Sequence, residues 1–466
     1  MNIKSAIKEL KRRNVIKAAI AYLAIAWLIL QVFSLLFPLL NAPTWILKIL
    51  TLVLFIGFPC WIIFSCKYQI TWEGIRKIDV EGVTFSKEVK VISALIFLVI
   101  FIPFSFLILR PAKNSKVRNV TSLKEITTDT LTNGANLTKN LAALDFYLKG
   151  EYHFKRQSLA DINLAIDNYL KAIENDSHFA MAYSNLGSAY MRKNLSFDPN
   201  IKWEEEAYSA AGKALQLDPK LANPHIIQGQ FFWSPSHNFA HEAAMNEFKK
   251  AIIKDSTNSQ SYEQLSLVQL HVGLFKEALK NAKKSITLDP GNYRARRFIA
   301  EIYLFQGNYK QALKEFNKIP KSFAQQPTQA FKALTYFYIE DSEMAIQILK
   351  ENLETFPNCP HSNSVYAIIL SSRGENKEAL KKIKIAFDNL DDFIHAHHIY
   401  YYLAISYNLM NDKQEAIKWL EKAIDTGFPN YPLFKSDPKL QNLNNQAGYL
   451  NLLSKLEKEW EYFKAI

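Results

Sequence analysis

A set of small and apolar residues recurs along the last two-thirds of the chain at a spacing close to 34, and this period restricts the fold more than any other feature. Each repeat contains a helix with an alanine near its start and mostly apolar residues four and seven positions later. Four consecutive intervals between these alanines are 33 or 34 residues. A fixed period in this range is the signature of a solenoid of stacked repeats. The alanines are Ala165, Ala207, Ala244, Ala278, Ala312, Ala345, Ala379 and Ala416.

A second helix is expected before each of these, with a small residue such as Gly187 or Ala300 where the two helices cross. A larger side chain at the crossing would overpack it, at a cost of about 1–3 kcal/mol. Pro219 and Pro290 follow the alanine-bearing helices and end them, because proline cannot continue a helix. A helix–turn–helix unit of 34 residues is the tetratricopeptide-repeat (TPR) value. The sequence therefore predicts an all-α TPR solenoid, a right-handed superhelix.

We expect about eight TPR units over residues 141–430, followed by a capping segment and a helix over 431–466. No single unit can bury its apolar face alone, so stacking must create one continuous core. An all-α protein with accidental spacing is the alternative, and eight units in phase argue against it. Arrays of this kind usually bind other protein chains rather than catalyse reactions.

The N-terminal part of the chain contains three apolar segments, at about 18–40, 45–66 and 91–109. The first has 23 residues without a charge, which as a helix would span about 35 Å and cross a hydrocarbon core of about 30 Å. A cleaved signal peptide is the alternative for the first segment, but its apolar stretch is too long. A buried core helix is the alternative for the third. We expect three transmembrane helices within residues 1–110 and a polar linker over 111–140.

The distribution of charge favours a membrane protein over a nucleic-acid-binding one. The net charge is +12, yet residues 1–118 contain 16 Lys and Arg against 5 Asp and Glu, which leaves 40 against 39 for the rest. A nucleic-acid-binding domain would need the basic excess on its folded surface. Eleven Lys and Arg lie before the first span or in the loop 67–90, and five follow the third span.

Because the positive-inside rule places the more basic flanks in the cytoplasm, the N-terminus and the loop 67–90 are expected to be cytoplasmic. The TPR array would then lie in the periplasm, with the spans in a bacterial inner membrane. If the third segment does not span, the array faces the cytoplasm.

Short motifs along the chain resemble bacterial TPR membrane proteins that share the N-terminal membrane segment of membrane-bound adenylate/guanylate cyclases and winged-helix regulators. In that family the loop after the second span normally contains Thr-Pro-Glu-Gly, and Trp72 replaces the proline here. Members with a known activity carry a cyclase or DNA-binding domain before the first span, and the roughly 14 polar residues there fit neither. The resemblance implies a membrane anchor with an interaction array. The motifs are Glu9–Val15, Ala21-Tyr22, Ala26-Trp27, Phe37-Pro38, Ile70–Lys77, Gly427–Pro432, Asp437-Pro438 and the helix ending near Trp460.

Motifs that would indicate catalysis are missing from the sequence. We find no Gly-rich phosphate loop, no GxGxxG after a strand, no HExxH and no GxSxG. His395, His397 and His398 lie close in sequence, and the first and last would share a helix face. No cysteine or carboxylate is placed to complete a metal site there. We therefore predict no enzymatic activity, no cofactor and no metal, and interpret this stretch as an aromatic helix with polar edges.

The concave surface of the solenoid is the predicted binding site. In a TPR unit the first helix lines this surface, and Arg294 and Arg297 lie one turn apart there, where they could bind a carboxylate or an acidic peptide. Neighbouring aromatic residues could serve as anchors. The predicted groove residues are Gln260, Glu263, His271, Arg294, Arg297, Glu301, Phe305, Phe331 and Tyr338.

These observations predict a membrane-anchored, non-enzymatic TPR scaffold or adaptor that binds a protein or peptide and no nucleic acid. The alternative is a sensor or regulatory subunit of a bacterial transmembrane signalling system, which would act on a separate cytoplasmic effector. A sensor should show a ligand-dependent change in the loop 67–90, and a passive scaffold should not.

Overall fold

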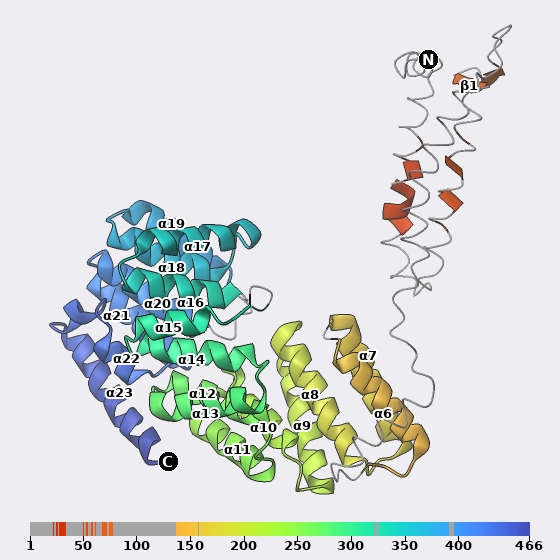
Figure 1. The fold of residues 1–466 in the computed structure, drawn as a ribbon, viewed down its shortest axis with the longest axis horizontal. Helices are drawn as coiled ribbons and strands as arrows, with labels where there is room; N and C mark the ends of the chain where they lie inside the picture. The colour runs from red at the N-terminus through yellow and green to blue at the C-terminus, as the bar shows by residue number, and fades with distance from the viewer. Residues whose placement is uncertain are drawn as a thin grey trace. The chain divides into compact units, whose positions relative to one another are not determined.

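The structure is a computed structural model with two compact units, Met1–Thr132 and Asn133–Ile466, which are described separately below (Figure 1). Most of the second unit is described, and a small part of the first. The described residues are 22, 25–26, 28–33, 50, 53–54, 57–58, 61, 68–71, 74–77, 137–156, 158–320, 323, 326–390 and 396–466.

The described residues of the first unit are short helical stretches and one hairpin. The Tyr22 hydroxyl donates a hydrogen bond of 2.6 Å to the Leu54 carbonyl, which joins two of these stretches. Strands β1 (Tyr68–Thr71) and β2 (Gly74–Lys77) pair in antiparallel register, with Tyr68 opposite Lys77. This hairpin is an exception to the predicted all-α fold, and it lies within the predicted cytoplasmic loop.

Among the described residues, no helix combines the length and the apolar character needed to cross a membrane. The predicted span over 91–109 lies wholly outside the described residues, and so does most of 18–40 and 45–66. The predicted linker 111–140 is described only from residue 137 onward.

The described part of the second unit forms eight helical hairpins in sequence (Figure 1). The first helices of the hairpins are α6 (Leu141–Phe154), α8 (Ala180–Ser196), α10 (Asn223–Phe232), α12 (Ser259–His271), α14 (Tyr293–Phe305), α16 (Gln326–Tyr338), α18 (Pro360–Ser372) and α20 (Ala396–Leu409). The second helices are α7 (Leu159–Asn175), α9 (Ile201–Leu217), α11 (His241–Lys254), α13 (Phe275–Leu288), α15 (Tyr309–Phe316), α17 (Ser342–Thr355), α19 (Asn376–Asp388) and α21 (Lys413–Asp425). A 3-10 turn, η1 (Pro235–His237), precedes α11, and the chain ends with α22 (Tyr431–Ser436), η3 (Gln441–Leu443) and α23 (Ala447–Ala465).

The alanines that define the repeat lie on the second helices and are completely buried. All eight have 0% exposure, from Ala165 on α7 to Ala416 on α21. The side chains four and seven positions later are buried as well, each at 9% exposure or less. The predicted helical solenoid is therefore confirmed for this unit, and the repeat pattern corresponds to the face of each second helix that packs inward.

Each first helix carries a small buried residue where its partner crosses it. A β-carbon at Gly150 would lie 2.5 Å from the Tyr169 ring, and one at Gly229 would lie 2.4 Å from the Phe248 ring. Both distances are shorter than real contacts allow, so only glycine fits at these two crossings. The residues at this position are Gly150, Gly187, Gly229, Ser266, Ala300, Ala333, Ala367 and Ala404.

The turn inside several hairpins is a left-handed C-terminal cap. Gly273, Gly307 and Gly374 have φ between 75° and 79°, two residues beyond the end of α12, α14 and α18. The amide of the next residue returns to the helix in each case, as in the bond from Leu274 N to Gln269 O (2.8 Å), which satisfies a carbonyl that the helix end leaves free. Asn411 takes the same role after α20, with φ 66°.

Replacing Gly229 by alanine tests the crossing, with Gly212→Ala as a matched control. A β-carbon at Gly212, inside α9, meets nothing within 4 Å. Gly212→Ala should stabilise the array by about 0.5–1 kcal/mol through helix propensity. Gly229→Ala gains the same propensity but must displace the buried Phe248 ring, and should be destabilising by about 1–3 kcal/mol. Thermal unfolding of the two purified variants, followed by circular dichroism, should move in opposite directions. Equal shifts would contradict the crossing geometry.

Candidate functional site: the closed inner surface of the array

The C-terminal end of the array folds back onto the third and fourth hairpins. The Asn430 side-chain amide donates to the Leu270 carbonyl at 2.8 Å, and the Trp460 indole N–H donates to the Gly273 carbonyl at 3.2 Å. The Tyr462 hydroxyl donates to Glu242 at 2.8 Å. These partners are 160 to 220 residues apart in sequence. Figure 1 shows the result, with α23 in dark blue running back beside the green helices of these hairpins.

Residues 427–438, here called the return segment, fill the inner surface between α12, α14 and α20. The Phe428 ring is fully buried, and its centroid lies 4.8 Å from that of His398, 5.5 Å from that of His271 and 5.9 Å from that of Phe305. Burying an aromatic side chain of this size contributes on the order of 2–3 kcal/mol. The return segment therefore supplies an aromatic core where an open solenoid would present a groove.

A buried carboxylate ties the return segment to two first helices. Asp437 accepts hydrogen bonds from the Tyr338 hydroxyl on α16, at 2.9 and 3.0 Å, and from the Tyr401 hydroxyl on α20. Its Oδ1 also accepts from the Lys439 amide at 2.8 Å. Burial raises the pKa of Asp437, and burial together with the Asp437 charge raises the pKa of both tyrosines well above 10. Each hydroxyl therefore remains a donor across the physiological range.

The predicted groove residues divide into a covered set and an accessible set. Gln260 and Arg294 are exposed, and Arg297 and Tyr338 are partly buried. Partner contact stays a prediction for all nine. Glu263 is contacted by Asn292 and Arg294, whereas a partner could reach the other covered side chains only if the return segment or α20 were displaced. The covered side chains are Glu263, His271, Glu301, Phe305 and Phe331.

The two predicted arginines are paired within the array. Arg297 forms an ion pair with Glu301 one turn along α14, and Arg294 Nε lies 3.3 Å from Glu263 Oε1 on α12. Burial raises the pKa of Glu301 to about 7, although Arg297 opposes the shift. The Arg297 guanidinium is largely buried, whereas the side chain of Arg294 is 49% exposed. Only Arg294 of this pair presents a charge to solvent.

A third arginine approaches the same inner surface from an earlier hairpin. Burial lowers the pKa of Arg192 on α8, the positive charge of Arg294 lowers it further, and Glu263 opposes the shift. The guanidinium also lies 6.0 Å from the centre of the Phe154 ring. The sequence analysis missed Arg192, although it occupies the same place in α8 that His271 occupies in α12, five residues after the small crossing residue. Applying the inward-facing positions to the second hairpin would have found it.

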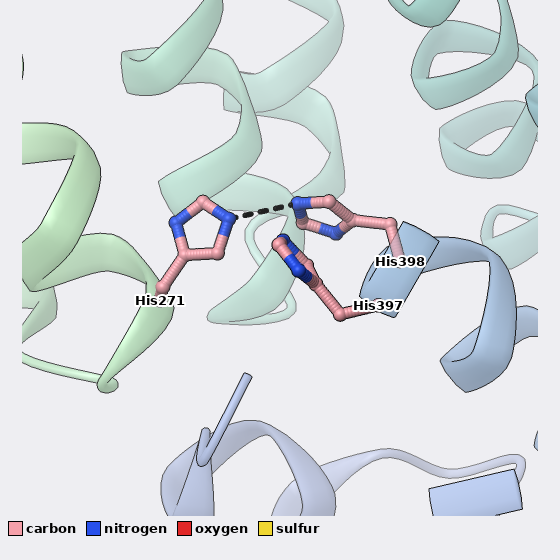
Figure 2. Close-up of side chains that lie close together, drawn as sticks. All are labelled: His271, His397 and His398. Carbon is pink, nitrogen blue, oxygen red and sulfur yellow. Dashed lines mark hydrogen bonds between the residues drawn. The ribbon is translucent and has the colours of Figure 1, made fainter. Parts of the chain in front are cut away.

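Three histidines meet where α12 and α20 come together (Figure 2). His271 Nε2 lies 3.1 Å from His398 Nε2, and the His271 and His397 ring centroids are 4.9 Å apart. All three side chains are buried. The sequence analysis grouped His397 and His398 with His395, which lies outside the described residues. It could not bring in His271, because that residue is 127 positions from His398.

The raised pKa of Glu301 predicts a pH-dependent contribution to stability. A carboxyl with a native pKa of about 7 and an unfolded value of 4.5 binds more protons when folded. Its stabilising contribution is full below pH 4.5 and is lost as the pH rises to about 7, by about 3 kcal/mol in total. The free energy of unfolding of the wild type, minus that of Glu301→Gln, should therefore fall across this window in denaturant titrations. Glu277→Gln, at an exposed position on α13, is the matched control for the substitution itself. A constant difference for Glu301→Gln would contradict the burial argument.

No curated protein sequence matches the chain. Several solved structures resemble it. A tetratricopeptide repeat protein from Parabacteroides merdae is 15% identical, with a TM-score of 0.39, over 61% of this chain and 99% of its own. The Pseudomonas aeruginosa protein pilF is 19% identical, with a TM-score of 0.38, over 47% of this chain and 95% of its own. YrrB, described as a TPR protein with an unusual peptide-binding site, is 21% identical, with a TM-score of 0.32, over 42% and 95%. At these TM-scores the similarities carry no argument about function.

The tetratricopeptide-repeat family matches the chain in two places. One match covers residues 269–335, which contain α13, α14 and α15, and the other covers residues 397–426, which contain α21 and nearly all of α20. Both stretches coincide with helical hairpins whose crossing residues are buried. The chain therefore contains tetratricopeptide repeats.

Proposed function

We propose that this protein is a membrane-anchored, non-enzymatic scaffold or adaptor whose TPR array binds an acidic segment of a partner protein. The observation that carries the proposal is the half-exposed Arg294 of the fifth hairpin, whose Nε lies 3.3 Å from Glu263 Oε1. Its positive charge also acts on Arg192 of the second hairpin. TPR arrays typically serve as interaction modules, and the repeats at 269–335 and 397–426 support such a role here.

The chemistry of these two side chains favours an anionic partner. Each guanidinium can hold a carboxylate through two parallel hydrogen bonds. Burial, and after it the positive charge of Arg294, lowers the pKa of Arg192. An anion placed between the two guanidinium groups would relieve this repulsion. Glu263 supplies one negative charge at this place, through its contact with Arg294. An acidic peptide would add further negative charge, and its carboxylates would replace water at the guanidinium groups with direct hydrogen bonds.

The stacked hairpins supply the second requirement, which is a preformed surface. Arg192 lies on α8 and Arg294 on α14, and both helices are fixed by buried crossings rather than by mobile loops. A surface that is already ordered loses little conformational entropy when a peptide binds. Gln260, exposed at the start of α12, extends the same face with an amide that can hydrogen-bond a peptide backbone.

The membrane anchor of the proposal rests on the sequence. The segments at 18–40, 45–66 and 91–109 have the length and lack of charge that a bilayer requires. The excess of lysine and arginine before the first segment and in residues 67–90 favours a cytoplasmic N-terminus and a periplasmic array in the inner membrane of a bacterium.

Site-specific photo-crosslinking in intact bacterial cells tests both parts. A photoreactive residue at Gln260 should capture a partner protein whose crosslinked peptide is rich in aspartate or glutamate. Arg294→Glu or Arg192→Glu should reduce the adduct by at least tenfold, because each replaces attraction by repulsion. Protease added to spheroplasts should degrade the array and leave a membrane-protected N-terminal fragment.

The matched control lies on the outer surface of the array. Lys384 on α19 has a side chain that is 75% exposed, and it pairs only with Asp388 on its own helix among the described contacts. A photoreactive residue there should capture nothing above background, and Lys384→Glu should leave the adduct at Gln260 unchanged. An adduct insensitive to both arginine reversals would refute the acidic-segment proposal. An array that protease reaches only after the membrane is opened would refute the periplasmic placement.

A further inference from the structure

We propose that His271, His397 and His398 bind a d¹⁰ transition-metal ion, Zn²⁺ or Cu⁺, which holds the closed array together. Each histidine offers one ring nitrogen, and within the described residues these three nitrogens all lie within 4.8 Å of one another. Figure 2 shows the three rings facing a common point, with His271 approaching from one side and His397 and His398 from the other.

The spacing of the nitrogens suits coordination to one ion. Two imidazole nitrogens at about 2.0–2.1 Å from a tetrahedral Zn²⁺ are about 3.3 Å apart. His271 Nε2 and His398 Nε2 are 3.1 Å apart. The third nitrogen lies within reach after a small ring rotation, because the set as a whole spans no more than 4.8 Å.

Hydrogen bonds to the backbone orient two of the rings for this role. His271 Nδ1 lies 2.7 Å from the Leu267 carbonyl, and His397 Nδ1 lies 2.8 Å from the Thr426 carbonyl. A carbonyl oxygen only accepts, so both Nδ1 atoms carry the proton. In the neutral ring the lone pair is then on Nε2. Metal-binding histidines usually have this arrangement, in which the second nitrogen donates to a backbone carbonyl or a carboxylate.

The third ring must change tautomer when the ion binds. Because the proton of neutral His271 is on Nδ1, its Nε2 accepts the hydrogen bond that His398 Nε2 donates. Metal binding moves the His398 proton from Nε2 to Nδ1 and replaces this hydrogen bond by two metal–nitrogen bonds. All three rings stay neutral, so the ion adds only its own charge.

The surroundings limit the choice of ion. Imidazole ligands suit zinc and copper, and a d¹⁰ ion accepts three ligands without a preferred geometry from its d electrons. The rings of Trp233 and Phe428 pack against His271, and Arg297 is the nearby cation. An added charge is costly in such a site. Monovalent Cu⁺ carries the smaller cost, and Zn²⁺ gains the stronger attraction from the lone pairs.

The position of the ligands gives the ion a structural role. His271 is the last residue of α12, in the fourth hairpin, and His397 and His398 open α20, in the eighth. An ion bound to all three would cross-link hairpins that are remote in sequence but meet where the array closes. Binding to the closed form alone would stabilise that form by mass action.

The purified full-length chain, stripped with a chelator, should be titrated with Zn²⁺ and, anaerobically under reducing conditions, with Cu⁺ buffered by a competing chelator. We expect one equivalent of one of these ions per chain and a higher unfolding temperature. His271→Gln and His398→Gln should each weaken binding at least tenfold. His361→Gln should not, because His361 is a buried histidine on α18 outside the cluster.

X-ray absorption of the loaded wild type removes any dependence on how well the variants fold. Three nitrogen ligands at about 2.0 Å support the site. The proposal would be overturned if neither ion bound stoichiometrically, or if the ligand set contained sulfur or mainly oxygen. It would also be overturned if binding survived in each of the two glutamine variants. If neither ion binds, the three histidines serve only as a hydrogen-bonded part of the core.

Discussion

The close approach of two helices within each hairpin determines the rest of this structure. At Gly229 there is no room for a β-carbon beside the Phe248 ring, and at Gly187 one would lie 3.0 Å from the Ala207 carbonyl. Such crossings leave the two helices of a hairpin little freedom to change their angle, because any rotation would drive backbone into side chain. Eight similar hairpins stacked in order therefore accumulate a definite curvature, which brings α20 against α12.

Closure changes the character of the inner surface. In an open solenoid the inward positions of α12, α14 and α16 would meet water or a ligand. Here Phe428 and the Asp437–Tyr401 contact take the place of that water or ligand. The residues that they cover are part of the buried core. Of the predicted groove arginines, Arg294 keeps its side chain 49% exposed, and its charge acts on Arg192 of the second hairpin. The same closure brings three histidines together. Closure of the array therefore accounts both for the proposed metal site and for the covering of predicted groove residues.

The sequence predicted the local units well, because their determinants are local. The alanine period, the crossing glycines and the prolines that follow the second helices all act within one hairpin, and buried residues such as Ala278 match the pattern at every repeat. The inward direction of Glu263 and Phe305 was also predictable from their place in the first helix. That Phe305 would be covered was not, since the covering Phe428 lies 123 positions away.

Two further features were beyond the reach of the sequence for the same reason. The contact between His271 and His398 depends on curvature summed over four hairpins, and small errors at each crossing would separate them. The first two intervals between the repeat alanines are 42 and 37 residues, and these longer intervals change how the early hairpins stack. The regular period near 34 does not predict that change. Arg192 differs, because the repeat pattern alone places it on the inner face.

A spin-label distance across the point of closure tests this account most directly. The Lys249 ammonium on α11 donates to the backbone oxygen of Ile466 at 2.8 Å, although the residues are 217 positions apart. Labels at positions 249 and 464, in a chain whose three cysteines are replaced by serine, should give one short and narrow distance distribution. A broad distribution at long distance would mean that the array is open and that the return segment does not fill its inner surface.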